Sequence, residues 1–186
     1  MSVTVSEITY YKAGVTTSAT SAVVGYESDS RRVVRYTLQV EGQGANQLYV
    51  YHAFAPRSGV SVPTLCVNIS TDPDIYKNTN GNISGYLAEM KVRSDINAFE
   101  VTLTDIILAP GLTYYLWVYP KTDNYAWVDY HRNTEYWEVT ASGSAGLVYI
   151  DLGSGFEPYQ CYIDNGSSWD LYIPYIDNGS SWDLCS

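Results

Sequence analysis

Apolar and polar side chains alternate along most of this chain, a pattern that is typical of β-strands rather than helices. Within Arg32–Glu41 every second position is apolar, and Phe99–Leu103 repeats the alternation. The other segments with strand character are Val3–Tyr10, Val15–Val24, Gln47–Phe54, Thr64–Ser70, Thr113–Tyr119, Tyr125–His131, Glu135–Ala141 and Leu147–Asp151. Turn-rich stretches of Gly, Pro, Asn and Ser separate them. Many short strands at this spacing predict an all-β chain with an antiparallel β-sandwich.

A short motif before one predicted strand bears on the type of sandwich. Leu108 is followed two residues later by Pro110 and six residues later by Tyr114, which begins a strand. This resembles the tyrosine corner of fibronectin type III and immunoglobulin-like sandwiches, where the Tyr hydroxyl ties the backbone of the corner. The preceding strands are numerous and irregularly spaced, so a jelly-roll sandwich remains an alternative. We predict that residues 1–146 form this domain.

Composition excludes several classes of protein. Of 186 residues, 46% are hydrophobic, 16% are charged and 19 are Tyr, which is too apolar and aromatic for a disordered chain. Twenty acidic against ten basic residues give a net charge of −10, which would repel the phosphates of nucleic acid. No run approaches the roughly 20 apolar residues of a membrane helix. We therefore expect no nucleic-acid partner and no membrane insertion.

The C-terminal part of the chain is a tandem repeat. Units of 13 residues start at Tyr149, Tyr162 and Tyr175, and the last two share the ten residues Tyr-Ile-Asp-Asn-Gly-Ser-Ser-Trp-Asp-Leu. Asn165-Gly166 is a strong signal for a two-residue type I′ hairpin turn. We therefore predict that residues 147–186 form a ladder of three β-hairpins. A two-residue turn would set three aromatic pairs directly opposite each other, Tyr149 with Phe156, Tyr162 with Trp169, and Tyr175 with Trp182.

The repeat region is strongly acidic. Residues 149–186 contain six acidic residues and no Lys or Arg, which favours solubility and opposes aggregation at strand edges. Convergent carboxylates could also bind Ca²⁺, but no Asp-x-Asp-x-Asp-Gly loop is present. Cys66, Cys161 and Cys185 lack metal-ligand spacing and are interpreted as inert thiols, although Cys161 and Cys185 could pair. We expect no metal and no cofactor.

The repeated unit Tyr-Ile-Asp-Asn-Gly-Ser-Ser-Trp-Asp at the end of a Tyr-rich β-domain resembles structural proteins encoded in phages and prophages of Gram-positive gut bacteria. There the unit recurs at the C-terminus of tail-region or surface-appendage proteins. The upstream segments 31–36 and 108–117 are similar to the same architecture. The resemblance implies a virion component. We expect it to assemble with other virion proteins and with itself as a homo-oligomer. The N-terminus lacks a signal-peptide pattern, which suits a virion protein released by lysis.

Catalytic motifs are missing from the sequence. It contains no Gly-x-Ser-x-Gly, no His-Glu-x-x-His and no phosphate-binding glycine loop. His52 and His131 have no nucleophile or metal partner in view, and a lone strand histidine is usually structural. We therefore predict a protein that is not an enzyme. A remnant of a wall-degrading enzyme is the weakest alternative.

Sugar binding is the second function that the residues suggest. Tyr115, Trp117 and Tyr119 alternate along one predicted strand, and Tyr125 and Trp127 share a face of the next. Aromatic faces beside amides and hydroxyls suit sugar rings, but the same residues could be core. The repeat aromatics Tyr162, Trp169, Tyr175 and Trp182 could likewise form two sugar sites or pack between hairpins. The leading hypothesis is a non-catalytic phage structural protein for assembly or host attachment, and the alternative is a carbohydrate-binding adhesin module.

Overall fold

The chain folds entirely as antiparallel β-structure in the residues that its computed structural model describes. These are 2–17, 22–27, 30–42, 44–77, 85–130, 137–143, 148–151, 156–159, 161–164, 169–172, 175–177 and 182–184. No helix occurs within these ranges, and every pair of strands is antiparallel. The predicted all-β, antiparallel class is confirmed.

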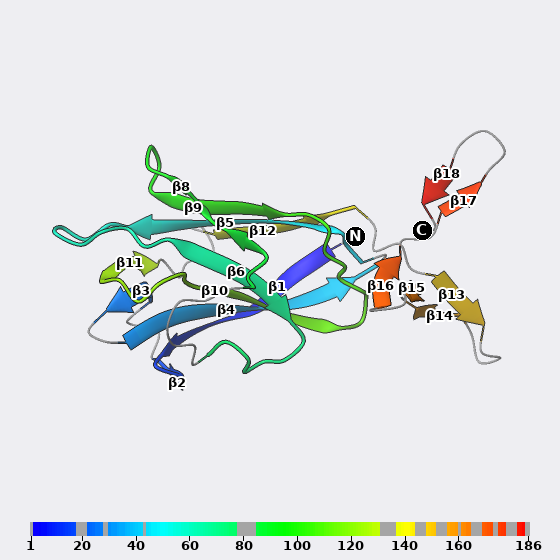
Figure 1. Cartoon of the computed structure of the whole chain (residues 1–186), viewed down its shortest axis with the longest axis horizontal. Helices are drawn as coiled ribbons and strands as arrows, with labels where there is room; N and C mark the ends of the chain where they lie inside the picture. Colours follow the sequence, from blue (N-terminus) through cyan, green and yellow to red (C-terminus); the bar gives the residue numbers. More distant parts are fainter. Residues whose placement is uncertain are drawn as a thin grey trace.

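Twelve strands form one continuous sheet (Figure 1). They are β1 (Ser2–Lys12), β2 (Val15–Thr16), β3 (Val23–Glu27), β4 (Ser30–Glu41), β5 (Gln47–Ala55), β6 (Leu65–Ser70), β7 (Ala88–Glu89), β8 (Lys91–Arg93), β9 (Ala98–Leu103), β10 (Thr113–Pro120), β11 (Ala126–Tyr130) and β12 (Trp137–Ser142). The order is β7-β6-β10-β4-β3-β11-β5-β9-β8, with β1 beside β4 and β12 beside β5.

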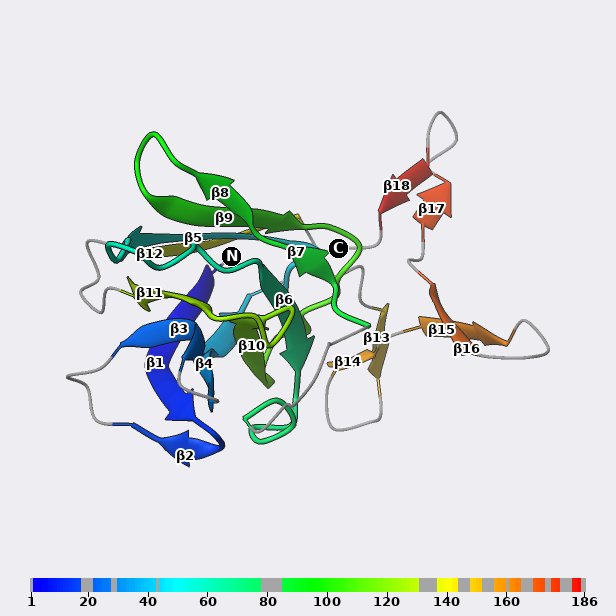
Figure 2. The ribbon, with the colours of Figure 1, turned by 60° about the vertical axis from the view of Figure 1, so that its left-hand side comes forward.

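This sheet bends so that two groups of strands enclose the main core. Figure 2 shows β5, β8, β9 and β12 on one side and β1, β4, β6 and β10 on the other, while β3 and β11 link the two groups. Tyr36 and Leu38 of β4 are buried in one cluster with Leu48 and Val50 of β5 and Phe99 of β9. Each fully buried side chain of this size contributes about 1.5–3 kcal/mol. The alternation in the sequence therefore marks the face that closes over this core.

Most predicted strands appear within a residue or two of the expected bounds, but Val15–Val24 is not one strand. It divides into β2 and β3. Thr17 follows β2 and bonds to the Tyr10 carbonyl with its backbone N–H (2.8 Å) and its hydroxyl (3.3 Å). Thr and Ser compete for backbone partners in this way, which explains why β2 ends at Thr16. The short strands β7 and β8 were not predicted.

The tyrosine-corner motif forms the contact that its sequence predicts. The Tyr114 hydroxyl accepts a hydrogen bond from the Ala109 backbone N–H at 2.9 Å. Gly111 takes a φ of 77°, which favours glycine, and its N–H donates to the Val40 carbonyl at 3.0 Å. The corner therefore ties the start of β10 to the end of β4.

Replacing Tyr114 by Phe should lower the free energy of unfolding by about 1–3 kcal/mol, because the Ala109 N–H would lose its acceptor in a buried place. Urea denaturation followed by tryptophan fluorescence measures this. Tyr125→Phe removes the same hydroxyl from a ring that is 59% exposed and should leave stability within about 0.5 kcal/mol. Equal effects of the two variants would show that the hydrogen bond of the corner contributes nothing to the free energy of unfolding.

The three repeats form three separate two-stranded sheets, outside the large sheet (Figure 1). Their strands are β13 (Val148–Asp151) with β14 (Phe156–Tyr159), β15 (Cys161–Asp164) with β16 (Trp169–Tyr172), and β17 (Tyr175–Asp177) with β18 (Trp182–Leu184). Hairpin pairing within each repeat was predicted. The arrangement of the hairpins as a ladder stays a prediction.

The predicted register of the repeats is wrong by two residues. Trp169 is opposite Asp164 rather than Tyr162, and Tyr162 is opposite Leu171. The other repeats agree, with partners Asp151 and Phe156, Tyr149 and Pro158, Asp177 and Trp182, and Tyr175 and Leu184. In each repeat the innermost described pair therefore joins the Asp and the aromatic residue. The Asn165-Gly166 turn itself lies outside the described residues.

Cys66 on β6 is a free, fully buried thiol. Burial, as the largest cause, raises its pKa to about 11, so little thiolate exists at pH 8. In the native protein, alkylation of Cys66 by iodoacetamide at pH 8 should be at least about 100-fold slower than in urea, because both access and thiolate are lacking. Peptide mass spectrometry reads Cys66 separately from the other cysteines. Equal rates in the native and unfolded chain would contradict the burial. Cys185 lies outside the described residues, so the pairing of Cys161 with Cys185 stays a prediction.

Candidate functional site

The aromatic residues predicted on β10 lie mostly inside the protein. Trp117 and Tyr119 are 0% exposed, and Tyr115 is partly buried. Tyr76, from the segment after β6, stacks on Tyr119 with 5.3 Å between ring centroids and meets Trp117 edge-on at 6.1 Å. Tyr11 of β1 packs against Trp117 at 5.6 Å. Because a sugar needs an accessible ring face, Trp117 and Tyr119 do not form the predicted platform.

The face of β10 opposite the main core carries a second aromatic cluster, which consists of Tyr11, Tyr76, Trp117 and Tyr119. Arg35 packs against this cluster. Its guanidinium is 5.0 Å from the Tyr115 ring centroid and 5.9 Å from that of Trp117. It donates hydrogen bonds to the Pro73 carbonyl at 2.9 Å and to the Thr9 hydroxyl at 3.2 Å. Arg35 therefore fixes the segment after β6 over the cluster, which is a structural role.

Tyr125 and Trp127 lie at the start of β11, where a more accessible site is built. Tyr125 is 59% exposed, whereas Trp127 is buried. The Arg57 guanidinium covers Trp127 at 4.7 Å from the ring centroid. It also donates two hydrogen bonds to Asp129, at 2.6 and 2.7 Å. We call Arg57, Tyr125, Trp127 and Asp129 the β11 site.

The β11 site combines an exposed ring with a fixed charge pair. Hydrogen bonding to Asp129 raises the pKa of Arg57, so its guanidinium stays charged. Arg has five N–H donors, of which Nε and one Nη bind Asp129. The half-exposed Arg57 can therefore offer further donors to a hydroxyl-bearing ligand beside Tyr125. This chemistry suits a sugar ring.

The sequence predicted Tyr125 and Trp127 as binding residues but did not predict Arg57. Arg57 lies in a turn after β5, and the Ser61–Ala126 bridge brings this segment alongside the start of β11. No spacing in the sequence links Arg57 with Trp127, because the link depends on how two distant segments pair. The only local signal is an Arg in a Pro-Arg-Ser-Gly turn, where loops often carry binding residues.

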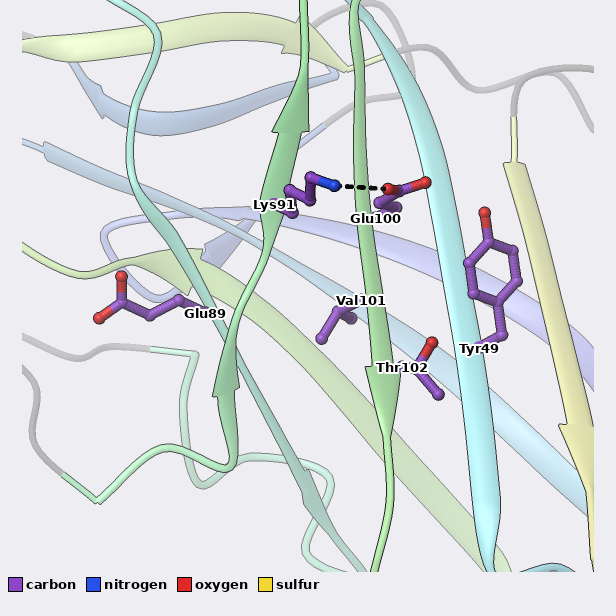
Figure 3. Close-up of a pocket in the computed structure, with 6 residues that line it drawn as sticks. All are labelled: Tyr49, Glu89, Lys91, Glu100, Val101 and Thr102. Atoms are coloured by element: carbon purple, nitrogen blue, oxygen red, sulfur yellow. Dashed lines mark ion pairs between the residues drawn. The ribbon is translucent and has the colours of Figure 1, made fainter.

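A shallow hollow of about 330 Å³ lies between β5, β8 and β9 (Figure 3). Its lining residues are Tyr49, Glu89, Lys91, Glu100, Val101 and Thr102. Figure 3 shows Lys91 facing Glu100, at 3.9 Å, while Glu89 points away from this pair. Glu89 pairs with Lys121 and accepts a hydrogen bond from Tyr86 at 2.6 Å, and these bonds lower its pKa, that from Lys121 most.

The carboxylates of this hollow do not match a glycosidase pair. Glu100 pairs with Arg93 at 3.4 Å in addition to Lys91. A glycosidase needs one carboxyl whose pKa is raised so that it can act as an acid, whereas Glu89 has a lowered pKa. The hollow therefore offers paired charges and hydroxyls, and Glu89 does not have the raised pKa of such an acid.

His52 is part of a buried aromatic network. Its ring stacks on Tyr130 with 3.3 Å between centroids, and its Nδ1 bonds to the Tyr36 hydroxyl. The Tyr36 and Tyr130 hydroxyls are 2.9 Å apart, and burial raises the pKa of both tyrosines. All three side chains are at most 1% exposed, so this network orders the core, as a lone strand histidine predicts. His131 lies outside the described residues.

Two further features of the described residues concern metal ions and membranes. In those ranges no group of three or more His, Cys, Asp or Glu could hold a metal ion. Nor do they include a helix with the length and apolarity needed to cross a membrane.

The repeat residues proposed for sugar binding lie on the separate hairpins. Tyr162 and Tyr175 are each opposite a Leu, and Trp169 and Trp182 are each opposite an Asp. Each Tyr is therefore two positions along the ribbon from the Trp, and not directly across from it.

No protein-family model matches the chain. A comparison with curated proteins also found no significant match.

Proposed function

We propose that this chain is a non-catalytic structural protein of a phage virion, which acts in assembly or host-surface attachment. The observation that carries the proposal is that each C-terminal repeat forms its own two-stranded sheet, and that among the described residues none of its strands pairs with the large sheet. The resemblance of the repeated unit to phage tail-region and appendage proteins supplies the biological context. For the body, the Tyr114 corner supports an immunoglobulin-like sandwich over a jelly roll.

The isolated hairpins need further contacts to be stable. A two-stranded hairpin alone is marginally stable in water, and each outer strand leaves backbone donors and acceptors unpaired. A neighbouring hairpin, another virion protein or a second copy of the chain would satisfy them. We propose that the hairpins form a ladder that joins the chain to these partners in a homo-oligomer, and that the protein is made in the host cytoplasm and released by lysis.

Purified particles test this proposal. Lysates of the producing cells are separated on a density gradient, and peptides of this chain are quantified against those of the major particle proteins. We expect the chain to sediment with particles at a constant ratio across preparations. Antibody labelling in electron micrographs then identifies the part of the particle. Recovery of the chain only in the soluble fraction would refute a virion role.

The β11 site favours carbohydrate binding as a second candidate function. Its exposed Tyr125 ring and the donors of Arg57 are the features that a sugar would use. Binding of the full chain to a glycan array should be lost in Tyr125→Ala. Leu112→Ala, which removes a side chain 49% exposed just before the start of β10, is the matched control. An array without signal, or equal loss in both variants, would reject the β11 site as a glycan site.

A further inference from the structure

The outer face of β5 carries two tyrosine rings that the sequence did not single out. Tyr49 and Tyr51 alternate along β5 with Val50 and His52, which are buried in the body, so the two tyrosines point to the opposite face of the strand. Both are half-buried, and neither belongs to the main core or to the second aromatic cluster. Unlike Trp117 on β10, which is fully buried, they keep part of their surface accessible to a ligand.

This face is continuous with the β11 site. Asp129 of β11 is directly opposite Ala55 of β5, and directly opposite residues share a face of the sheet. Trp127 is two residues before Asp129 and therefore lies on the same face. From Ala55 the face continues along β5 to the two tyrosines, over a length of about 20 Å at the usual rise per residue. We call this surface the β5 track, and its residues on β5 are Tyr49, Tyr51, Ala53 and Ala55.

Each tyrosine of the track has a polar side chain directly opposite it on both neighbouring strands. These are Thr140 of β12 and Thr102 of β9 for Tyr49, and Glu138 and Glu100 of the same two strands for Tyr51. The shallow hollow between β5, β8 and β9 borders the track, since Tyr49 and Thr102 both line it (Figure 3). Flat rings flanked by hydroxyl and carboxylate groups suit sugar units, which stack on rings and use their hydroxyls for hydrogen bonds.

The charges of this surface select the class of glycan. Its basic side chains are already paired with carboxylates, namely Arg57 with Asp129, Lys91 with Glu100, and Arg93 with Glu100. Glu138 has no basic partner within the described residues and accepts a hydrogen bond from the Thr140 hydroxyl at 2.7 Å. A polymer that carries carboxylates or phosphates would therefore meet an unneutralised carboxylate and no unpaired cation on this face. An uncharged glycan avoids this repulsion.

We propose that the β11 site and the β5 track together bind an uncharged linear glycan of the host surface, with one unit at Tyr125 and later units along Tyr51 and Tyr49. The inference rests on the proposed carbohydrate binding and deepens it, because it names the ligand as a chain of several units. Residues two apart on a strand are about 7 Å apart, so the two tyrosines contact neighbouring units. Each further unit binds at high effective concentration, and the affinity therefore rises with chain length.

A glycan array with matched chain lengths tests this inference. The array carries uncharged linear glycans as two-unit and six-unit oligomers, beside uronic-acid and phosphate-bearing glycans of the same lengths. We expect the full chain to bind an uncharged six-unit glycan at least about tenfold more tightly than its two-unit form. Tyr49→Ala/Tyr51→Ala should weaken the six-unit glycan about tenfold through the loss of two ring contacts. It should leave the two-unit glycan within about twofold, whereas Tyr125→Ala should weaken both.

Two further variants separate ring stacking from a structural role. Tyr49→Phe/Tyr51→Phe keeps both rings and should retain the affinity for the six-unit glycan within about threefold. Leu87→Ala/Leu112→Ala is the matched control, because it removes two side chains that are 50% and 49% exposed outside the track and should leave both affinities unchanged. Thermal unfolding of each variant shows that the body is intact.

Four outcomes would overturn the inference. These are no binding of any uncharged six-unit glycan, equal affinity for the two lengths, equal losses at both lengths in Tyr49→Ala/Tyr51→Ala, or tighter binding of the charged glycans. These outcomes are distinguishable from failure of the proposed function. Equal affinity for both lengths, together with loss in Tyr125→Ala, keeps the β11 site as a glycan site and removes the track. A chain that sediments with particles but binds no glycan keeps the virion role alone.

Discussion

Replacing Trp117 by Ala should lower the free energy of unfolding by about 3–5 kcal/mol, the usual cost of deleting a large buried aromatic side chain. Trp117 is 0% exposed and is the centre of the second aromatic cluster. Its ring contacts those of Tyr11 and Tyr76, and the Arg35 guanidinium lies 5.9 Å from its centroid. The measurement is equilibrium denaturation in urea, monitored by far-UV circular dichroism.

Tyr125→Ala is the control for this variant. The ring of Tyr125 is 59% exposed, so its removal should cost less than about 0.5 kcal/mol. Trp117→Phe, which keeps much of the packing, should fall between the two. A loss below about 1 kcal/mol for Trp117→Ala would show that the segment containing Tyr76 does not cover β10 in solution, and the sugar platform on β10 would again be a valid candidate.

Replacing Gly25 by Ala should destabilise the protein by at least about 3 kcal/mol, through backbone strain together with a steric clash. Gly25 is in the middle of β3, opposite Trp127 of β11, with a φ of +130° that L-residues rarely adopt. A Cβ there would lie 2.3 Å from the Ala126 carbonyl oxygen and 2.6 Å from the Trp127 Cα. Both atoms are backbone, so the strand itself must move.

Gly59→Ala separates the two contributions. Gly59 has a φ of +75°, but a Cβ there would meet nothing within 4 Å. We expect a loss of about 1–2 kcal/mol from the left-handed backbone alone. Urea denaturation of both variants gives the comparison. Similar losses for Gly25→Ala and Gly59→Ala would show that β3 and β11 are not as closely packed as the structure has them.

We propose different roles for the body of the protein and for its C-terminal hairpins. The body encloses a core containing Tyr36, His52 and Tyr130, with a second aromatic cluster on its outer face. These buried contacts suit a stable structural domain. As far as the described residues go, the hairpin strands pair only within each repeat, so further contacts are needed to stabilise them. This division suits a virion appendage in which the body anchors the protein and the repeats make contacts.

Much of the body was predictable, because strand alternation is a local property of the chain. Val34, Tyr36, Leu38 and Val40 are all buried on β4, as their spacing predicted. The Tyr114 corner was also readable, since its hydrogen bond joins residues only five apart. Hairpin pairing within each repeat followed from the periodic turns for the same reason.

The hairpin register could not be read in the same way. Asn165-Gly166 favours a two-residue turn, yet pairing begins with Asp164 opposite Trp169. A slip of two residues preserves the face of every side chain, so the hydrophobic pattern cannot distinguish the two registers. The pairing of Asp164 with Trp169 therefore appeared only in the structure.

By itself the sequence determined that Tyr114, Leu116 and Val118 lie on one face of β10 and that alternate residues lie on the other, because neighbouring side chains on a strand point to opposite faces. Only the tertiary structure decided that the second face is covered. Tyr76 packs over Trp117 and Tyr119 of this face, and on β11 Arg57 packs over Trp127. Such contacts join segments far apart in the chain. Their formation depends on the packing free energy of the whole fold, which local patterns do not encode.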